Sequence, residues 1–162
     1  MVRKVLVEDG GQIAEIYNYY ILNTTVTFEE QELSETQMKE RIEKISSSFP
    51  YLVFEENGII LGYAYATEWR VRSAYRYSVE SSVYVHKDVH GKGIGKQLYT
   101  ELLNQLKAKR IHAVIGGIVL PNPISISLHE KFGFIKVAQF KEVGFKYHQW
   151  LDVGYWELLF NN

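Results

Sequence analysis

The sequence predicts one α/β domain in which helices flank a single mixed sheet. Two observations lead to this expectation. Segments with the period-two pattern of half-buried strands are interspersed along the chain with segments in which apolar residues recur every three or four positions, as in amphipathic helices. The chain of 162 residues, 46% of them hydrophobic, is long enough to bury one core, and it carries no repeat, linker or low-complexity tract. We therefore expect residues 1–162 to form one domain.

The first part of the chain predicts, in order, a strand, two helices and a hairpin. Residues 2–7 predict the strand, and the first helix has one apolar stripe, made by Ile13, Ile16, Tyr17, Tyr20 and Ile21. The second helix begins at Ser34, which forms a capping box with the glutamine three residues on. Strands at 51–55 and 59–67 form the hairpin, because Glu56-Asn57-Gly58 between them has the composition of a tight turn.

The second part predicts a strand, a helix, a strand, a helix and two last strands. The first strand shows strict alternation, with apolar Tyr75, Tyr77, Val79, Val83 and Val85 between polar Arg76, Ser78, Glu80 and Ser82. The helix after it has Ile94, Leu98, Leu102 and Leu106 at every fourth position. A strand at 112–120 precedes a helix that Asn122 caps and Gly133 ends. Strands at 134–140 and 153–160 then flank an expected loop at 141–150.

The turn between the strand that ends at Val85 and the helix that begins at Ile94 is the most informative segment. Glycines there allow positive φ and close backbone approach, so the free N–H groups at the start of the helix can converge on a phosphate. A Walker A loop needs Ser or Thr at Gln97, and a dinucleotide turn needs glycine at Lys96, so both motifs fail. A glycine turn without a ligand is the simpler alternative. The predicted diphosphate-binding residues are His90, Gly91, Lys92, Gly93, Ile94, Gly95 and Lys96.

Composition narrows the class of function. Eighteen basic and nineteen acidic residues give a net charge of −1, which argues against a dedicated nucleic-acid or anionic-membrane binder. No apolar run approaches the roughly 20 residues that span a bilayer, and no signal-peptide pattern is present, so we expect a cytoplasmic protein. The chain has no cysteine, which excludes disulfides, thiolate metal sites and an acyl-cysteine intermediate. No metal site is predicted.

Five separated motifs carry a resemblance to a known family: Trp69–Tyr75, Val79–Val85, Leu120–Asn122, Leu128–Glu130 and Trp150–Trp156. In this order they resemble the phosphinothricin N-acetyltransferase branch of the GNAT superfamily, which includes methionine sulfone and methionine sulfoximine acetyltransferases. The glycine turn also fits the GNAT pattern [Gln/Arg]-x-x-Gly-x-[Gly/Ala], with His90 in place of Gln or Arg. The likeness extends from about residue 24 to residue 160. It implies a twisted, mostly antiparallel sheet of about six or seven strands with about four helices, acetyl-CoA as co-substrate, and a homodimer.

The resemblance also implies catalytic roles. Glu80, on the polar face of its strand, stands at the family position of the general base, which takes the proton of the attacking amine. A solvated glutamate or an ion-pair partner of an arginine is the alternative. His129 stands where the branch has a histidine that can protonate the leaving thiolate or relay a proton, and a helix histidine bonded to the sheet is the alternative. A backbone N–H between Val83 and Val85 is expected to polarise the thioester carbonyl. Asn122 and Ser125 match coenzyme A contacts, although helix capping alone explains Asn122.

Substrate recognition is expected just before the catalytic strand. Arg70 and Arg72, two residues apart on an extended segment, would point the same way and fork onto a carboxylate or phosphinate. Tyr75 belongs to the same cluster, Phe28 would cover the substrate from the opposite side, and Tyr147 would close the pocket. These side chains can equally be solvated charges and core aromatics.

The chain is thus expected to acetylate the α-amine of a small amino-acid-like compound by direct attack in a ternary complex. A protein or peptide N-acetyltransferase on the same fold and a non-catalytic acyl-CoA binding module are the alternatives.

Overall fold

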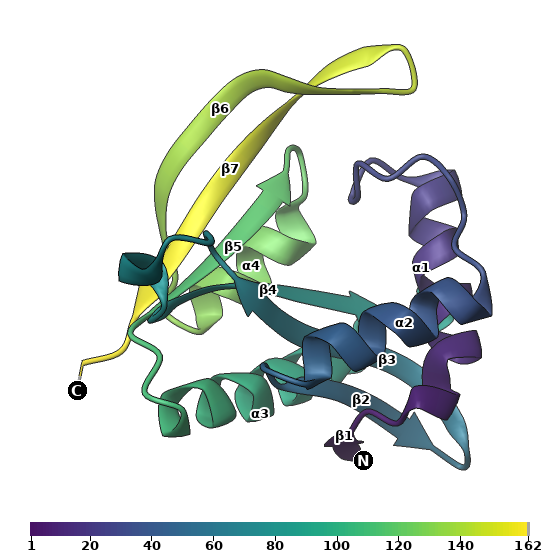
Figure 1. Ribbon diagram of the computed structural model, residues 1–162. Helices are drawn as coiled ribbons and strands as arrows, with labels where there is room; N and C mark the ends of the chain where they lie inside the picture. Colours follow the sequence, from purple (N-terminus) through teal and green to yellow (C-terminus); the bar gives the residue numbers. More distant parts are fainter. Residues whose placement is uncertain (162) are drawn as a thin grey trace.

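A seven-stranded sheet forms the centre of the computed structural model, which describes residues 1–161 (Figure 1). The strand order is β1-β2-β3-β4-β5-β7-β6, and every neighbouring pair is antiparallel except β4 and β5. This arrangement confirms the expected mixed, mostly antiparallel sheet. The strands are β1 Val2–Lys4, β2 Tyr51–Glu56, β3 Ile59–Glu68, β4 Ser78–Val85, β5 Ala113–Val119, β6 Ile135–Lys146 and β7 Gln149–Leu159.

Four α-helices in the described part of the chain pack on the two faces of the sheet. They are α1 Gly10–Asn23, α2 Glu35–Ser46, α3 Ile94–Ala108 and α4 Pro123–Lys131. One core joins α1 and α2 to side chains such as Tyr51 and Tyr63, and a second core joins α3 and α4 to side chains such as Leu52 and Val114. The predicted capping box at Ser34 is confirmed, because its hydroxyl accepts from the Gln37 N–H and the Gln37 side chain accepts from the Ser34 N–H. We call the two sides of the sheet the α1/α2 face and the α3/α4 face.

Successive side chains of β4 point to opposite faces, as the strand pleat requires. Tyr84 packs in the core with α1 and α2, whereas Val79 packs in the core with α3. Glu80 therefore lies on the α1/α2 face, and Ser81 lies on the α3/α4 face. This alternation places Glu80 on the face opposite to α4, the helix that carries His129.

The parallel pair β4 and β5 separates halfway along β4. Pairing covers Ser78–Glu80 opposite Ala113–Ile115, while β4 stays paired with β3 as far as Val85. The His86 N–H, just after β4, donates to the carbonyl of Leu61 in β3 at 2.9 Å. Because backbone groups alternate along a strand, the N–H groups of Val83 and Val85 point to the open edge. The sheet thus presents free backbone donors in the gap where β5 diverges.

Two predicted element boundaries are wrong. The strand expected from residue 75 begins at Ser78, because residues 73–75 form a 3-10 turn and leave Tyr75 42% and Tyr77 50% exposed. The exposed tyrosines mimic the alternation of a half-buried strand without having a core to face. Likewise, the first strand ends at Lys4, before a 3-10 turn at Val7–Asp9.

The loop expected at 141–150 is also wrong, because β6 and β7 continue as a two-stranded arm beyond the rest of the sheet (Figure 1). Tyr147 and His148 form its tight turn with φ of 52° and 58°. Two consecutive positive φ values define a hairpin turn that normally carries Asn or Gly. A register shift between Phe140 and Gly144, where Glu142 has φ of 51°, further breaks the alternation. The sequence therefore lacks the usual signals of this hairpin.

Candidate active site

The glycine turn is open and lies at the start of α3. Gly93 caps the helix with φ of 77° and Gly91 has φ of 80°, so both adopt the left-handed conformation that glycine tolerates best. A Cβ built at either glycine would meet no atom within 4 Å. The first backbone N–H groups of α3 are therefore accessible at the positive end of the helix dipole. This geometry is compatible with the anion site that the sequence predicts, and the binding of a diphosphate there stays a prediction.

The His90 side chain is turned toward α1. Its Nε2 lies 2.8 Å from the Tyr20 hydroxyl and 3.2 Å from the Val85 carbonyl oxygen. Tyr20 also donates to that carbonyl at 2.5 Å, and burial raises the pKa of Tyr20 to about 12. The His90 side chain thus contacts the end of β4. The contact with the diphosphate that is predicted for His90 would therefore be made by its backbone.

Glu80 is half-buried on the α1/α2 face, where β4 and β5 separate. Burial raises the pKa of its carboxyl above the usual range, and the nearby Arg70 guanidinium opposes part of that rise. Within residues 1–161, no side chain forms a hydrogen bond or ion pair with this carboxylate. A carboxylate that is partly desolvated and unpaired in this way is suited to accept a proton.

Gly117 of β5 makes room beside Glu80. A Cβ at this glycine would lie 3.3 Å from Glu80 Oε1 and 3.1 Å from Cε1 of Tyr155 on β7. Both groups therefore reach the same point on the α1/α2 face. Tyr155 was not predicted from the sequence, where it reads as one more apolar position of a strand.

His129 lies on the α3/α4 face and is only 4% exposed. Its Nδ1 lies 2.7 Å from the Ser125 carbonyl oxygen, so Nδ1 carries the proton and Nε2 accepts from the Tyr99 hydroxyl at 2.7 Å. Tyr99 in turn lies 2.9 Å from the Ser81 hydroxyl. Burial lowers the pKa of His129, which favours the neutral ring. The sheet separates His129 from Glu80, and the chain through Tyr99 connects it to β4.

Two residues predicted to contact coenzyme A, Asn122 and Ser125, also have structural roles at the start of α4. Asn122 Oδ1 accepts from the Ser125 N–H at 3.1 Å and caps α4. Ser125 Oγ lies 3.4 Å from His129 Nδ1. Their contacts with coenzyme A stay predictions.

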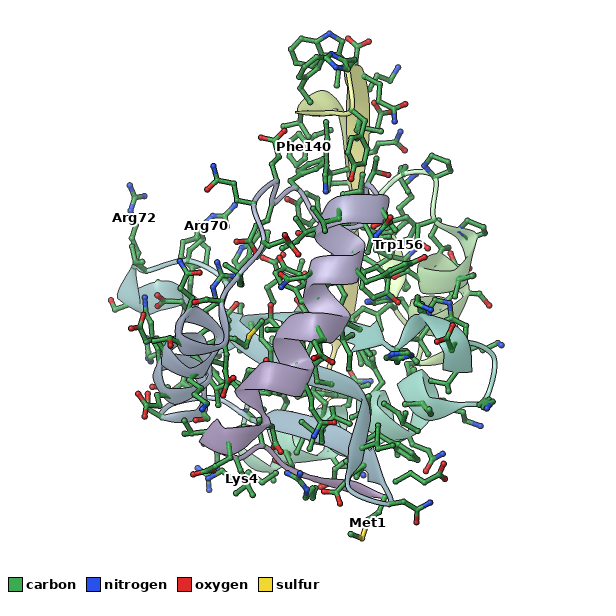
Figure 2. The ribbon with its side chains drawn as sticks, turned by 90° about the vertical axis from the view of Figure 1, so that its right-hand side faces the viewer. Met1, Lys4, Arg70, Arg72, Phe140 and Trp156 are labelled. Atoms are coloured by element: carbon green, nitrogen blue, oxygen red, sulfur yellow. The ribbon has the colours of Figure 1, made fainter. Side chains whose placement is uncertain are left out.

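The two arginines do not form the expected fork. The chain bends after β3, so Arg70 and Arg72 do not lie on an extended segment. Arg70 stacks 4.0 Å from the Trp69 ring centroid, whereas Arg72 points away from the body of the molecule (Figure 2). Arg70 is therefore the arginine whose charge acts on the Glu80 carboxylate. Tyr75 lies in the 3-10 turn that follows them.

Hydrogen bonds connect the end of α1 and the loop after it to the β6–β7 hairpin. Lys146, 2% exposed, donates from Nζ to the carbonyls of Ile21 at 2.9 Å and Thr27 at 2.8 Å. The Tyr147 hydroxyl also donates to the Ile21 carbonyl at 2.9 Å. The Phe28 ring occupies the space where Gly144 lacks a side chain. The structure thus brings the predicted residues Phe28 and Tyr147 together, with Lys146, which no sequence signal singled out.

Removing the Lys146 amine should loosen this connection. In Lys146→Met two carbonyls lose their donor, so the free energy of unfolding should fall by about 2 kcal/mol, which is the order of the cost of leaving buried polar groups unpaired. Urea unfolding measures it. Lys141→Met, an exposed lysine of the same strand, is the matched control and should change little. Equal stability of the two variants would contradict this role for Lys146.

Within residues 1–161, no helix is long and apolar enough to cross a membrane, and no group of three or more His, Asp or Glu side chains is placed to hold a metal ion.

The family model described as an acetyltransferase (GNAT) domain matches residues 2–154. The phosphinothricin N-acetyltransferase of Streptomyces viridochromogenes is 35% identical, over 96% of this chain and 85% of that protein. The L-methionine sulfoximine/L-methionine sulfone acetyltransferase of Salmonella typhimurium is 36% identical, over 93% of this chain and 88% of that protein. The chain belongs to the GNAT acetyltransferase family, and it is similar to the phosphinothricin and methionine sulfone branch, as its motifs indicated.

Solved structures agree with this fold. A phosphinothricin acetyltransferase from Sinorhizobium meliloti, in complex with acetyl-CoA, superimposes with a TM-score of 0.94 at 38% identity, covering 98% of this chain and 87% of that one. A ribosomal-protein-alanine N-acetyltransferase from Brucella melitensis superimposes with a TM-score of 0.96 at 32% identity, covering 99% of both chains. The protein is therefore an N-acetyltransferase enzyme.

Proposed function

We propose that this enzyme transfers the acetyl group of acetyl-CoA to the α-amine of a small amino-acid-like compound, of the phosphinothricin or methionine sulfone type. The observation that carries the proposal is Glu80, an unpaired, half-buried carboxylate at the point where β4 and β5 separate, on the strand that leads to the glycine turn. The names of the two similar acetyltransferases from Streptomyces viridochromogenes and Salmonella typhimurium support the acceptor class.

Acetyl-CoA would be held by this chain's backbone. Its diphosphate would lie on the N–H groups of the glycine turn, and its pantetheine arm and thioester along the free donors of Val83 and Val85. The acceptor arrives mostly as an ammonium ion, and only its neutral amine attacks a thioester carbon. Glu80 takes one proton from the ammonium group, and the neutral amine forms a C–N bond with the thioester carbon. The C–S bond then breaks to release coenzyme A thiolate, which takes up the second proton lost by the nitrogen. The buried, neutral His129 would donate or relay a proton in this step along the hydrogen bonds that connect it through Tyr99 to Ser81.

A protein N-terminal acceptor is the second candidate, and the similarity to the Brucella melitensis structure favours it. The discriminating assay measures thiol release from acetyl-CoA with amino acids, with their sulfone, sulfoximine and phosphinate analogues, and with basic and alanine-ended peptides. Turnover with the small compounds alone supports the proposal. Turnover with peptides alone contradicts it, and no turnover with any amine indicates a binding module.

Arg70 should set the pH at which the enzyme loses activity on acidification. A positive charge near Glu80 favours its ionised form and holds its pKa down, so Arg70→Ala should raise that pKa further. Protonated Glu80 cannot accept a proton, and the acid limb of kcat should therefore move to higher pH. The pH profile at saturating substrate measures the shift. Arg72→Ala, whose charge does not act on Glu80, should leave the limb in place; equal limbs in both variants would contradict the assignment.

We also propose a homodimer formed through the β6–β7 hairpin, which exposes several large apolar side chains besides Phe140: Ile135, Val137, Val143, Phe145, Tyr147 and Trp150. Exposed large apolar side chains gathered on one element are typical of an interface. Light scattering should give twice the monomer mass at micromolar concentration. The double variant Phe145→Glu with Trp150→Glu should be monomeric. A monomeric wild type would refute the dimer without affecting the chemistry.

A further inference from the structure

Three aromatic side chains gather beside Glu80, and we call them the aromatic wall: Trp69, Phe140 and Tyr155. Tyr155 lies edge-on to both others, with ring centroids 5.7 Å from Trp69 and 5.7 Å from Phe140. The three residues come from the end of β3, from β6 and from β7, so the fold and not one sequence motif assembles them. Trp69 and Tyr155 lie in motifs that carry the family resemblance, but the sequence predicted no role in the site for any of the three residues.

Register places this wall on the same face as the catalytic carboxylate. Tyr155 is paired with Gly117 across β5 and β7, and Phe140 is paired with Val153, two residues before Tyr155 and on the same face. Because Gly117 has no side chain, both the Tyr155 ring and the Glu80 carboxylate reach the space above it. Phe140 is 55% exposed and Tyr155 is half-buried, so the wall can be reached from solvent; Figure 2 shows Phe140 near the base of the hairpin arm.

Glu80 and Arg70, the two charged side chains beside the wall, are placed to bind the α-amine and the α-carboxylate of an amino-acid acceptor. Its α-amine must lie at Glu80, which accepts the proton. Arg70, which stacks on Trp69 and acts on Glu80, is placed to meet the α-carboxylate. The acceptor's own side chain is then left to the aromatic wall, where no further cation from the described residues is stacked on Tyr155 or Phe140.

The geometry points to Tyr155 as a specificity-determining residue that selects acceptors with an uncharged side chain. Such a side chain gains from contact with ring surfaces. An anionic side chain would lose hydration there without a partner. Methionine sulfone should accordingly be preferred to phosphinothricin, whose side chain ends in a charged phosphinate. This inference rests on the proposed function and refines its acceptor.

The test compares kcat/KM for methionine sulfone with kcat/KM for phosphinothricin. The wild type should favour the sulfone by about 10-fold or more, the order of discrimination that one apolar contact surface supplies. Tyr155→Ala should raise KM for the sulfone and bring the ratio toward one, with an unchanged KM for acetyl-CoA. Tyr155→Phe should keep the ratio, because the ring remains. Tyr77→Ala, an exposed tyrosine outside the site, is the control and should also keep it.

A second variant keeps the inference testable if Tyr155→Ala fails to fold. Gly117→Ala inserts a methyl group 3.1 Å from the Tyr155 ring and should lower the ratio by displacing it. An unchanged ratio in folded Tyr155→Ala or Gly117→Ala overturns the inference, as does a wild type that prefers phosphinothricin, while both results leave the proposed function intact. If neither compound is acetylated, the proposed function fails as well.

Discussion

Glu80→Gln should lower kcat by about 10² or more at neutral pH, because the amide keeps the shape of the side chain but cannot accept the proton of the attacking amine. The affinity for acetyl-CoA should hold, since the glycine turn and the free edge of β4 are unchanged. Steady-state kinetics and titration calorimetry measure the two quantities. Raising the pH should partly restore turnover, because more of the amine is then already deprotonated and the missing base matters less.

A matched comparison separates catalysis from binding. Glu56→Gln, an exposed glutamate at the β2–β3 turn, should leave kcat unchanged. Arg70→Ala should raise KM for the acceptor more than it lowers kcat at its own pH optimum. If Glu80→Gln instead raises only KM and shows no recovery at high pH, Glu80 orients the amine, and the proton goes to water or along the path to His129.

Gly93→Asp should weaken acetyl-CoA binding by about 10²-fold, a loss of about 2.7 kcal/mol. The new carboxylate lies at the cap of α3, where it repels the diphosphate and fills the space that the backbone leaves open. Titration calorimetry with acetyl-CoA measures the affinity, and with coenzyme A alone it shows whether the acetyl group matters.

Gly58→Asp is the control, because Gly58 also has a positive φ, of 80°, and no atom within 4 Å of a built Cβ, but it lies in the β2–β3 hairpin turn. Any strain from the left-handed conformation is common to both variants. Equal, undiminished affinity in both would place the diphosphate elsewhere than the glycine turn.

The sequence predicted the parts of this molecule that rest on local patterns. Apolar periodicity located α1 and α3, capping residues located the starts of α2 and α4, and the glycines between Val85 and Lys96 located the open helix start. The polar position of Glu80 on an otherwise half-buried strand followed from alternation, and the structure adds what alternation cannot show, that β5 leaves β4 at this residue.

Features that depend on non-local pairing could not be predicted. The β6–β7 arm was missed because Tyr147 and His148 make its turn without glycine or asparagine. The Tyr155 ring reaches the space beside Glu80 because Gly117, far away in the sequence, has no side chain. Lys146 appears as an ordinary strand lysine until α1 and the loop after it supply carbonyls to its amine. Glu80 and His129 were each predicted as catalytic residues, and only the sheet shows that they lie on opposite faces.

The most direct test of the account is to incubate the protein with acetyl-CoA and methionine sulfone and to identify the product by mass spectrometry and NMR. We expect methionine sulfone acetylated on its α-nitrogen, with one coenzyme A thiol released for each product molecule, and almost no product with Glu80→Gln. Thiol release without acetylated product, or product formed as fast by Glu80→Gln at neutral pH, would contradict direct acetyl transfer assisted by Glu80.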